Sequence, residues 1–314
     1  MKLGLTPWNF HDRSAQALSA QAHRAEALGY ESFWLPENHF NAGAIPDPLM
    51  LLAAVAAATS RIRLATTSYL LPLRHPLQAA EQVAVLDQLS GGRVTLGIGR
   101  GYAPTMLKAF SVDPKLKRRL FADTLETMCQ AWRGEPVTVG EGDASEQIVL
   151  DPLPVQQPHP PLWVAAFGPK ALAQAGRLGF PYLASPVESL SSLEANYAQH
   201  AEAAESAGKP EVKTVPVMRT VFVAQSRRQG ESLREQVLAQ ARATPSVARK
   251  ADEPADAADD WCIVGEAGYV RDRIAEYRER LKVTHLIVTR LRLAGIESRA
   301  IEASLEAVPE LAAR

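Results

Sequence analysis

Short apolar runs alternate along most of the chain with longer stretches in which apolar residues recur every three or four positions. A short run is typical of a buried strand, whereas the recurrence is typical of a helix with one buried face. The first run, Lys2 to Leu5, precedes a helical stretch that Ser14 is placed to cap and Gly29 to end. The beginning of the chain therefore predicts one strand followed by one helix.

The same order repeats until eight strand and helix units are complete. The further predicted strands are residues 32–35, 63–68, 94–98, 162–166, 182–184, 214–223 and 285–289. The further predicted helices are residues 48–58, 76–89, 116–132, 170–178, 190–207, 232–243, 269–281 and 296–307. This count favours the α/β class and a single (β/α)8 TIM barrel with insertions over an open sheet, because closure leaves no strand edge.

We therefore predict one domain over residues 1–314, with loop insertions at about 135–161 and 244–260. The first insertion is rich in Pro, Gly and acidic residues, and the second is rich in Ala, Asp and Pro. Long loops in a compact domain are typically lids or binding loops. For the second insertion, a solvated segment without regular structure is the alternative.

Composition narrows the class of partner. The chain has 314 residues, 46% of them hydrophobic, and a formal net charge of -1. This balance argues against a nucleic-acid partner and favours a small-molecule substrate. No apolar stretch is long enough to cross a membrane and the N-terminal residues do not resemble a secretory signal, so we expect a soluble cytoplasmic protein. Cys129 and Cys262 lack metal-ligand spacing, which predicts core thiols and no metal site.

A glycine-rich turn with one cation follows the fourth predicted strand. The strand at 94–98 leads into Gly99, Arg100 and Gly101. In a barrel the carboxyl ends of the strands carry the chemistry, and a guanidinium there suits an anionic ligand. The alternative is a structural salt bridge of Arg100 at the barrel rim. The glycines lack the G-x-G-x-x-G spacing of a dinucleotide site.

The ends of three other strands also carry polar groups. Glu37, Asn38 and His39 follow the second strand, and Thr67 and Ser68 end the third. The fifth strand is followed by Phe167, Gly168, Pro169, Lys170 and Ala171, which open a helix. Free amides at a helix N-terminus bind phosphate readily. These side chains and amides are expected to converge at one mouth of the barrel.

Five ordered motifs resemble a known family. They are WLPENHF (34–40), LPLRHP (71–76), LDQLSGGR (86–93), GIGRG (97–101) and PLPVQQPHPPLWVA (152–165). Together they resemble the bacterial luciferase-like (LLM class) flavin-dependent monooxygenases, and the resemblance covers the whole chain. It implies a luciferase-like TIM barrel that binds a flavin at its C-terminal face.

The resemblance also implies where the cofactor lies. The phosphate of FMN is expected at Arg100 and at the turn from Gly168 to Ala171, with the ring against a cis peptide between Thr67 and Ser68. The alternative for these two residues is ordinary interior hydroxyls. Gly99 stands where luciferase has a reactive Cys, and Phe167 stands where the family has an acidic residue, which leaves backbone amides as the phosphate donors there.

The implied reaction is oxygenation. Reduced FMN would react with O2 to a C4a-peroxy species, which transfers one oxygen atom to a small organic substrate, and a separate flavin reductase would supply the reduced flavin. A coenzyme F420-dependent hydride transfer is the alternative activity. A non-catalytic flavin-binding protein is a second alternative, because Asn38 stands where luciferase has a catalytic His and Asn cannot exchange a proton near neutral pH.

Two expectations concern the remaining residues. His39 takes the catalytic role if the turn points it inward, and is otherwise structural, while Glu37 supports the pocket by hydrogen bonding.

The helices at 48–58 and 76–89 carry small and apolar residues on more than one face. Because family members often pair through these helices, a homodimer is expected, with close packing inside one barrel as the alternative.

Overall fold

The computed structural model describes residues 1–243, 260–289 and 295–313. Its contacts divide the chain into two compact units. The first unit consists of Met1–Trp8, Arg24–Glu31 and Ala166–Arg314, and the second of Asn9–His23 and Ser32–Ala165. Each unit is described by itself, and the single domain stays a prediction. Most of the second predicted insertion, residues 244–259, lies outside the described residues.

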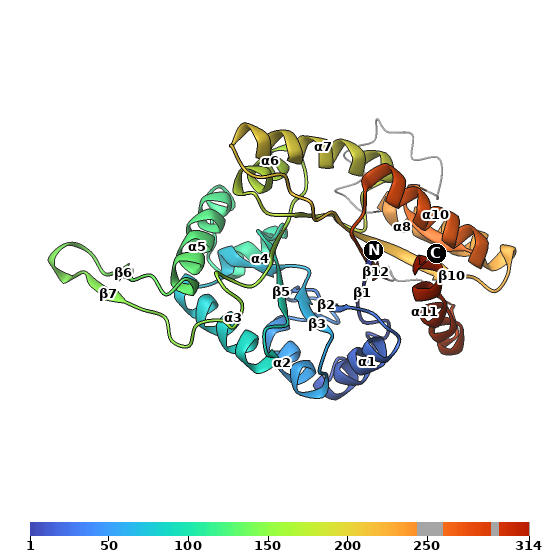
Figure 1. Ribbon diagram of the computed structural model, residues 1–314, viewed down its shortest axis with the longest axis horizontal. Helices are drawn as coiled ribbons and strands as arrows, with labels where there is room; N and C mark the ends of the chain where they lie inside the picture. Colours follow the sequence, from blue (N-terminus) through green and yellow to red (C-terminus); the bar gives the residue numbers. More distant parts are fainter. Residues whose placement is uncertain (244–259, 290–294, 314) are drawn as a thin grey trace. The chain divides into compact units, whose positions relative to one another are not determined.

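The second unit is a parallel sheet with helices packed beside it (Figure 1). Its strands lie in the order β2 (Ser32–Leu35), β3 (Arg63–Thr66), β5 (Val94–Gly99) and β8 (Leu162–Ala165), and the short β4 (Tyr69–Leu70) also pairs with β5. The helices are α2 (Pro48–Ala58), α3 (Pro76–Ser90), α4 (Pro104–Ala109) and α5 (Lys117–Trp132), with a 3-10 turn at Leu71–Leu73. Helix α1 (Ala15–Ala27) begins in this unit and ends in the other.

Local sequence explains where these helices begin and end. Asp47 caps α2, since its carboxylate accepts hydrogen bonds from the N–H groups of Leu49 at 3.1 Å and Met50 at 3.2 Å. Helix α3 ends at Gly91, whose φ of 63° lies in the left-handed region that glycine tolerates best. The Asp47 cap fixes the start of α2 and so the loop at the carboxyl end of β2, whereas Gly91 ends α3 directly before β5.

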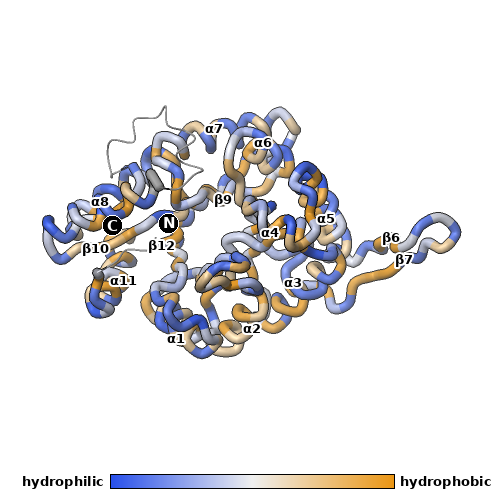
Figure 2. Tube along the Cα trace, turned by 180° about the vertical axis from the view of Figure 1, so that it is seen from behind, coloured by the Kyte–Doolittle hydropathy of each residue, from blue (hydrophilic) through white to orange (hydrophobic). Residues whose placement is uncertain are grey.

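The first unit contains a second parallel sheet. Its strands lie in the order β11 (Cys262–Gly265), β10 (Pro216–Val223), β12 (His285–Thr289) and β1 (Lys2–Leu5). Ala184, directly after β9 (Tyr182–Leu183), forms a bridge with Val217 of β10. The helices are α6 (Pro169–Leu178), α7 (Leu190–Ser206), α8 (Arg227–Ala243), α10 (Ala267–Leu281) and α11 (Ser298–Ala313). In Figure 2, β10 carries mostly apolar colours, whereas α8 is largely hydrophilic.

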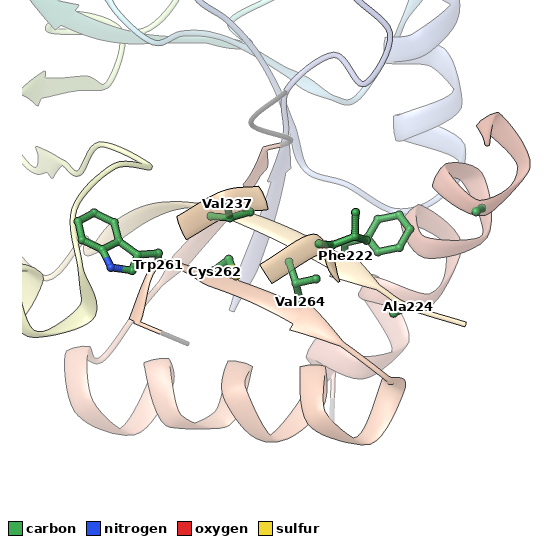
Figure 3. Packing of buried hydrophobic residues seen from close by; sticks show 8 residues of the cluster. Phe222, Ala224, Val237, Trp261, Cys262 and Val264 are labelled. Atoms are coloured by element: carbon green, nitrogen blue, oxygen red, sulfur yellow. The ribbon is translucent and has the colours of Figure 1, made fainter. Parts of the chain in front are cut away.

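A buried apolar cluster joins β10, β11 and α8 in the first unit (Figure 3). Phe222, Val264 and Val237 contribute side chains from the three elements, with Trp261 and Cys262 beside them. The buried position of Cys262 confirms its interpretation as a core thiol. On α5 of the second unit, burial raises the pKa of the Cys129 thiol to about 11 despite the neighbouring Arg133, so this thiol stays protonated at neutral pH.

Each strand predicted from an apolar run has a counterpart in the structure, which supports the α/β class. Several shorter elements were not predicted: β4, α4, β11 and an antiparallel hairpin of β6 (Val137–Val139) and β7 (Glu146–Ile148) inside the first predicted insertion. The hairpin extends away from the rest of its unit (Figure 1), and all three residues of β7 are exposed. Exposed strands need no apolar run, so the hydrophobic pattern does not reveal this hairpin.

Within the described residues, no helix is both long enough and apolar enough to cross a bilayer.

Candidate active site

The loops after β2, β3 and β5 meet at the carboxyl edge of the sheet in the second unit. The Thr67 N–H donates to the carbonyl of Leu35, the last residue of β2, at 2.8 Å. Leu70 of β4 is in register with Gly99, the last residue of β5. The predicted site residues of these three loops are therefore brought together.

The peptide bond between Thr67 and Ser68 is cis, as the resemblance to the luciferase-like family led us to expect. Both residues are half-buried. Gly99 lies against them, since a Cβ atom built at Gly99 would overlap the hydroxyl group of Ser68. A residue with a side chain therefore fits at this position only if Ser68 moves, and glycine lets the Ser68 hydroxyl approach the end of β5 closely.

Three cations gather where β5 ends. Arg100 is only 8% exposed, its Nη2 donates to the Ala165 carbonyl at 3.1 Å, and its guanidinium lies 5.4 Å from the centre of the Phe121 ring. Burial, and then the charge of Arg118, lowers the pKa of Arg100 to about 10.

Lys117, at the start of α5, completes this group. Its Nζ donates to the Gly101 carbonyl at 3.3 Å, and burial together with Arg100 and Arg118 lowers its pKa. We call Arg100, Lys117 and Arg118 the cationic cluster. The three positive charges repel one another. Binding of an anion among them would relieve this repulsion and is therefore favourable.

Glu37 is the centre of a buried polar network. Its side chain is fully excluded from solvent, and its Oε2 accepts a hydrogen bond from the Leu70 N–H at 3.0 Å and pairs with Arg74 Nη2 at 2.8 Å. Its Oε1 lies 2.9 Å from His39 Nε2. An ionised carboxylate only accepts hydrogen bonds, so His39 Nε2 is the donor. The turn thus points the His39 side chain, only 7% exposed, inward toward Glu37.

The rings around His39 form a small aromatic group. The imidazole meets the ring of Phe110 edge-on, with centroids 4.9 Å apart, and lies 5.7 Å from the ring of Phe40. Phe40 is 68% exposed and has a φ of 59°, a left-handed conformation that few non-glycine residues adopt. These contacts fix the plane of the His39 ring beside the Glu37 carboxylate.

Asn38 has a different role in the structure. The side-chain Oδ1 of Asn38 accepts a hydrogen bond from the backbone N–H of Ile45 at 2.9 Å. The backbone N–H of Asn38 donates to the Ile45 carbonyl at 3.0 Å. These two bonds close the loop between β2 and α2. A catalytic role for Asn38 stays a prediction.

The predicted phosphate turn belongs to the first unit. Helix α6 begins at Pro169 directly after Gly168, which has a φ of +83°. The Gly168 carbonyl accepts hydrogen bonds from the N–H groups of Ala171 at 3.0 Å and Leu172 at 3.1 Å, while Phe167 is 41% exposed. The predicted helix start is therefore present, and phosphate binding by Phe167, Gly168, Pro169, Lys170 and Ala171 stays a prediction.

Sequence reasoning did not assign a role to three residues that this geometry brings forward. Arg74 stands in the LPLRHP motif, which was noted only as part of a resemblance. Lys117 and Arg118 stand in the basic run KLKRR at 115–119. Such a run is equally typical of a solvated helix start and of an anion site. Only the packing of α5 against the end of β5 distinguishes Lys117 from its exposed neighbours.

Comparisons with known proteins bear on the family and the fold of this chain. The family model described as "Luciferase-like monooxygenase" matches residues 4–284. The oxygenase component of the flavin-dependent trigonelline monooxygenase of Acinetobacter baylyi is 28% identical over 215 residues, which cover 64% of this chain and 57% of that protein. The chain spans about half the length of the curated relatives that it matches.

Solved structures match over the whole chain. The oxygenating constituent of 3,6-diketocamphane monooxygenase from Pseudomonas putida, solved with FMN, has a TM-score of 0.82 at 24% identity and covers 100% of this chain and 98% of its own. The coenzyme F420-dependent tetrahydromethanopterin reductase of Methanopyrus kandleri has a TM-score of 0.71 at 20% identity, with 99% of each chain covered. At these identities the likeness concerns the fold.

Proposed function

Because the chain belongs to the luciferase-like monooxygenase family, we propose that it is a monooxygenase that uses reduced FMN and O2 to oxygenate a small organic substrate. The cationic cluster at the end of β5 carries the proposal, because it offers an anion-binding group beside the Thr67–Ser68 peptide. The curated relatives named as flavin-dependent or as monooxygenases support the same chemistry.

A closed barrel is part of this proposal. The eight strand and helix units predicted from the sequence have counterparts in the structure, and solved relatives cover 98% or more of this chain. Both observations support a single luciferase-like (β/α)8 barrel, in which the strand ends form the cofactor site.

The residues of the second unit suit FMN. The buried Arg100, the half-buried Lys117 and the exposed Arg118 match a phosphate dianion, since guanidinium and ammonium groups form charge-assisted hydrogen bonds with it. Gly99 lets the Ser68 side chain pack against the end of β5, and a side chain at Gly99 would displace the Ser68 hydroxyl, beside which we propose that the flavin ring binds. When bound, reduced FMN supplies the electrons for O2, of which one atom passes to the substrate and the other leaves as water.

The remaining residues orient groups and handle protons. Glu37 holds the His39 imidazole through Nε2, which leaves Nδ1 as the ring atom that accepts or returns a proton. Phe40 and Phe110 present apolar ring surface beside the imidazole, which suits an apolar or aromatic substrate. Asn38 fixes the loop that carries these side chains.

A replacement of Arg100 tests the cofactor site. Anaerobic titration of the purified protein with reduced FMN is compared between wild type and Arg100→Ala. A charge-assisted hydrogen bond contributes about 1.5 to 3 kcal/mol, so we expect the affinity to fall by about tenfold or more. The matched control is Arg119→Ala on α5, an arginine whose side chain is 80% exposed and pairs with Asp123. Equal affinity of Arg100→Ala and wild type would show that the phosphate does not bind there.

The same assay separates the competing functions. The coenzyme F420-dependent structural relative motivates the deazaflavin as the second ligand, and tighter binding of it than of reduced FMN would favour hydride transfer. Incorporation of an ¹⁸O atom from ¹⁸O2 into an apolar test substrate supports the monooxygenase. Binding of FMN without such incorporation across a substrate panel supports a flavin-binding protein.

A flavin reductase is the proposed partner. The trigonelline enzyme is named as the oxygenase component, which implies a second component in that system. We propose the same division for this chain, so that reduced FMN added from an unrelated reductase sustains its activity.

A further inference from the structure

The LPLRHP motif places one cation directly behind the Glu37 carboxylate. Arg74 Nη2 lies 2.8 Å from Glu37 Oε2, and the two side chains are 17% and 0% exposed. The guanidinium carbon lies 3.9 Å from the centre of the Tyr69 ring, so the cation is also held over an aromatic face. Among the described residues, neither Nε nor Nη2 of Arg74 makes a hydrogen bond, so the guanidinium is held by the ion pair with Glu37 and by the face of the Tyr69 ring.

The Glu37 carboxylate is shared between two neighbours. Its Oε2 receives the Leu70 N–H and the Arg74 cation, and its Oε1 receives His39 Nε2. A buried carboxylate stabilises a positive charge on whichever partner can carry one. If Glu37 faced His39 alone, its charge would favour an imidazolium, in which both ring nitrogens carry protons and neither accepts one. With Arg74 in place, the carboxylate is already neutralised.

We propose that Arg74 is a positioning residue that acts through Glu37 to keep the His39 imidazole neutral, with the proton on Nε2 and the lone pair on Nδ1. The role of Nδ1 as a proton acceptor rests on the proposed function, whereas the charge and tautomer of the ring do not. Arg74 thus determines whether His39 is available as a base, without touching substrate or cofactor.

The other polar groups around this network carry little charge toward His39. Burial raises the pKa of Tyr69, so its phenol stays neutral, and its hydroxyl donates to Gln82 at 3.1 Å. Asp47 acts electrostatically on Tyr69, but its carboxylate caps the N–H groups of α2. The Phe110 ring that packs against His39 is apolar. Among the described residues, Glu37 and its partner Arg74 are therefore the charged groups that the ion pairs connect to His39.

The test reads the imidazole itself in the protein without cofactor. Long-range ¹H–¹⁵N NMR spectra report the tautomer and the charge of each histidine ring as a function of pH, and His39→Gln identifies the signals of His39. The variants are Arg74→Met, Arg74→Lys, Glu37→Gln and the double variant Arg74→Met/Glu37→Gln. Arg119→Met, at an exposed position of α5, is the matched control for loss of an arginine.

We expect the wild-type ring to be neutral at pH 7 with its proton on Nε2. In Arg74→Met the midpoint of the His39 titration moves to higher pH by about one unit or more. The reason is that the negative charge of Glu37 is then no longer neutralised by Arg74 and stabilises the imidazolium. Arg74→Lys keeps the charge and retains most of the wild-type behaviour, although it lacks the fork geometry of Arg. In the Glu37→Gln background, Arg74→Met has no further effect on the midpoint, because it acts through Glu37.

Two results would overturn the proposal. One is an unchanged His39 titration in Arg74→Met, checked as folded by circular dichroism, and the other is a shift of equal size in the Glu37→Gln background. If Arg74→Met does not fold, Arg74→Gln against Arg74→Lys gives the same comparison of a neutral and a charged side chain. Reduced FMN is titrated into the same samples. Failure of wild type to bind it contradicts the proposed function and leaves the result on His39 unaffected.

Discussion

At the scale of single residues, Gly99 shows how one position limits what the site accepts. A Cβ atom at Gly99 would overlap the Ser68 hydroxyl and lie 3.0 Å from the Ser68 Cβ, which is closer than packed side chains tolerate. Gly99 and Ser68 therefore fit together as a pair. Glycine is present here because of a close approach, since its φ is not in the left-handed region.

A double-mutant cycle tests this pairing. Gly99→Ala should lower the free energy of unfolding by about 1 to 3 kcal/mol, as overpacking of a buried contact does. Ser68→Gly in the same chain should recover most of this loss, because it removes the atoms that the new methyl group meets. Urea denaturation of the four proteins measures both effects. Additive losses in the double variant would contradict the pairing.

At the scale of elements, the caps explain why the loops that carry the site hold their shape. Asp47 satisfies two of the N–H groups that α2 leaves unpaired, and α2 in turn buries Leu49 and Leu52 in the second unit. Asn38 and Ile45 close the loop between β2 and this helix. The positions of Glu37 and His39 thus depend on the start of α2 at Pro48, further along the chain.

Loss of the α2 cap is expected to destabilise the second unit moderately. Asp47→Ala removes both hydrogen bonds to the helix N-terminus and should lower the free energy of unfolding by about 0.5 to 2 kcal/mol. Asp47→Asn keeps an acceptor oxygen and should stay within a few tenths of wild type. Denaturant unfolding followed by circular dichroism measures the difference. Equal losses in both variants would assign the effect to charge and not to the cap.

The hydrophobic pattern predicted the main strands and helices because each buries one face or both. It also placed Glu37, His39, Thr67 and Arg100 at one edge, since parallel strands bring their carboxyl ends together. The role of Arg74 was not predicted, because the 3-10 turn at Leu71–Leu73 that brings it behind Glu37 has no periodic signal. The hairpin of β6 and β7 was not predicted for the same reason. The sequence also does not show that the Asn38 side chain closes the loop before α2, and a catalytic role for Asn38 stays a prediction.

At the scale of the whole molecule, helices α2 and α3 carry large apolar side chains that are exposed in the part of the chain that the structure describes. Met50 on α2 is 74% exposed, and Val85 and Leu89, one turn apart on α3, are 43% and 61% exposed. Ala54 and Ala57 continue the face of Met50 at helical spacing, so that another helix can approach closely. This surface supports the homodimer that the resemblance to the family implies.

Charge placed on this surface should separate the dimer. In a two-fold dimer each substitution occurs on both subunits, so the double variant Met50→Lys/Leu89→Lys puts four like charges into one interface. We expect wild type to have twice the monomer mass by light scattering coupled to size exclusion, and the double variant to elute as a folded monomer. Met50→Leu/Leu89→Met is the control, because it keeps the apolar surface and should remain dimeric.

A wild-type protein that is monomeric at micromolar concentration, or a lysine variant that stays dimeric, would contradict pairing through α2 and α3. The first result would assign the exposed side chains of these helices to a monomer surface, and the second would assign the dimer to other elements.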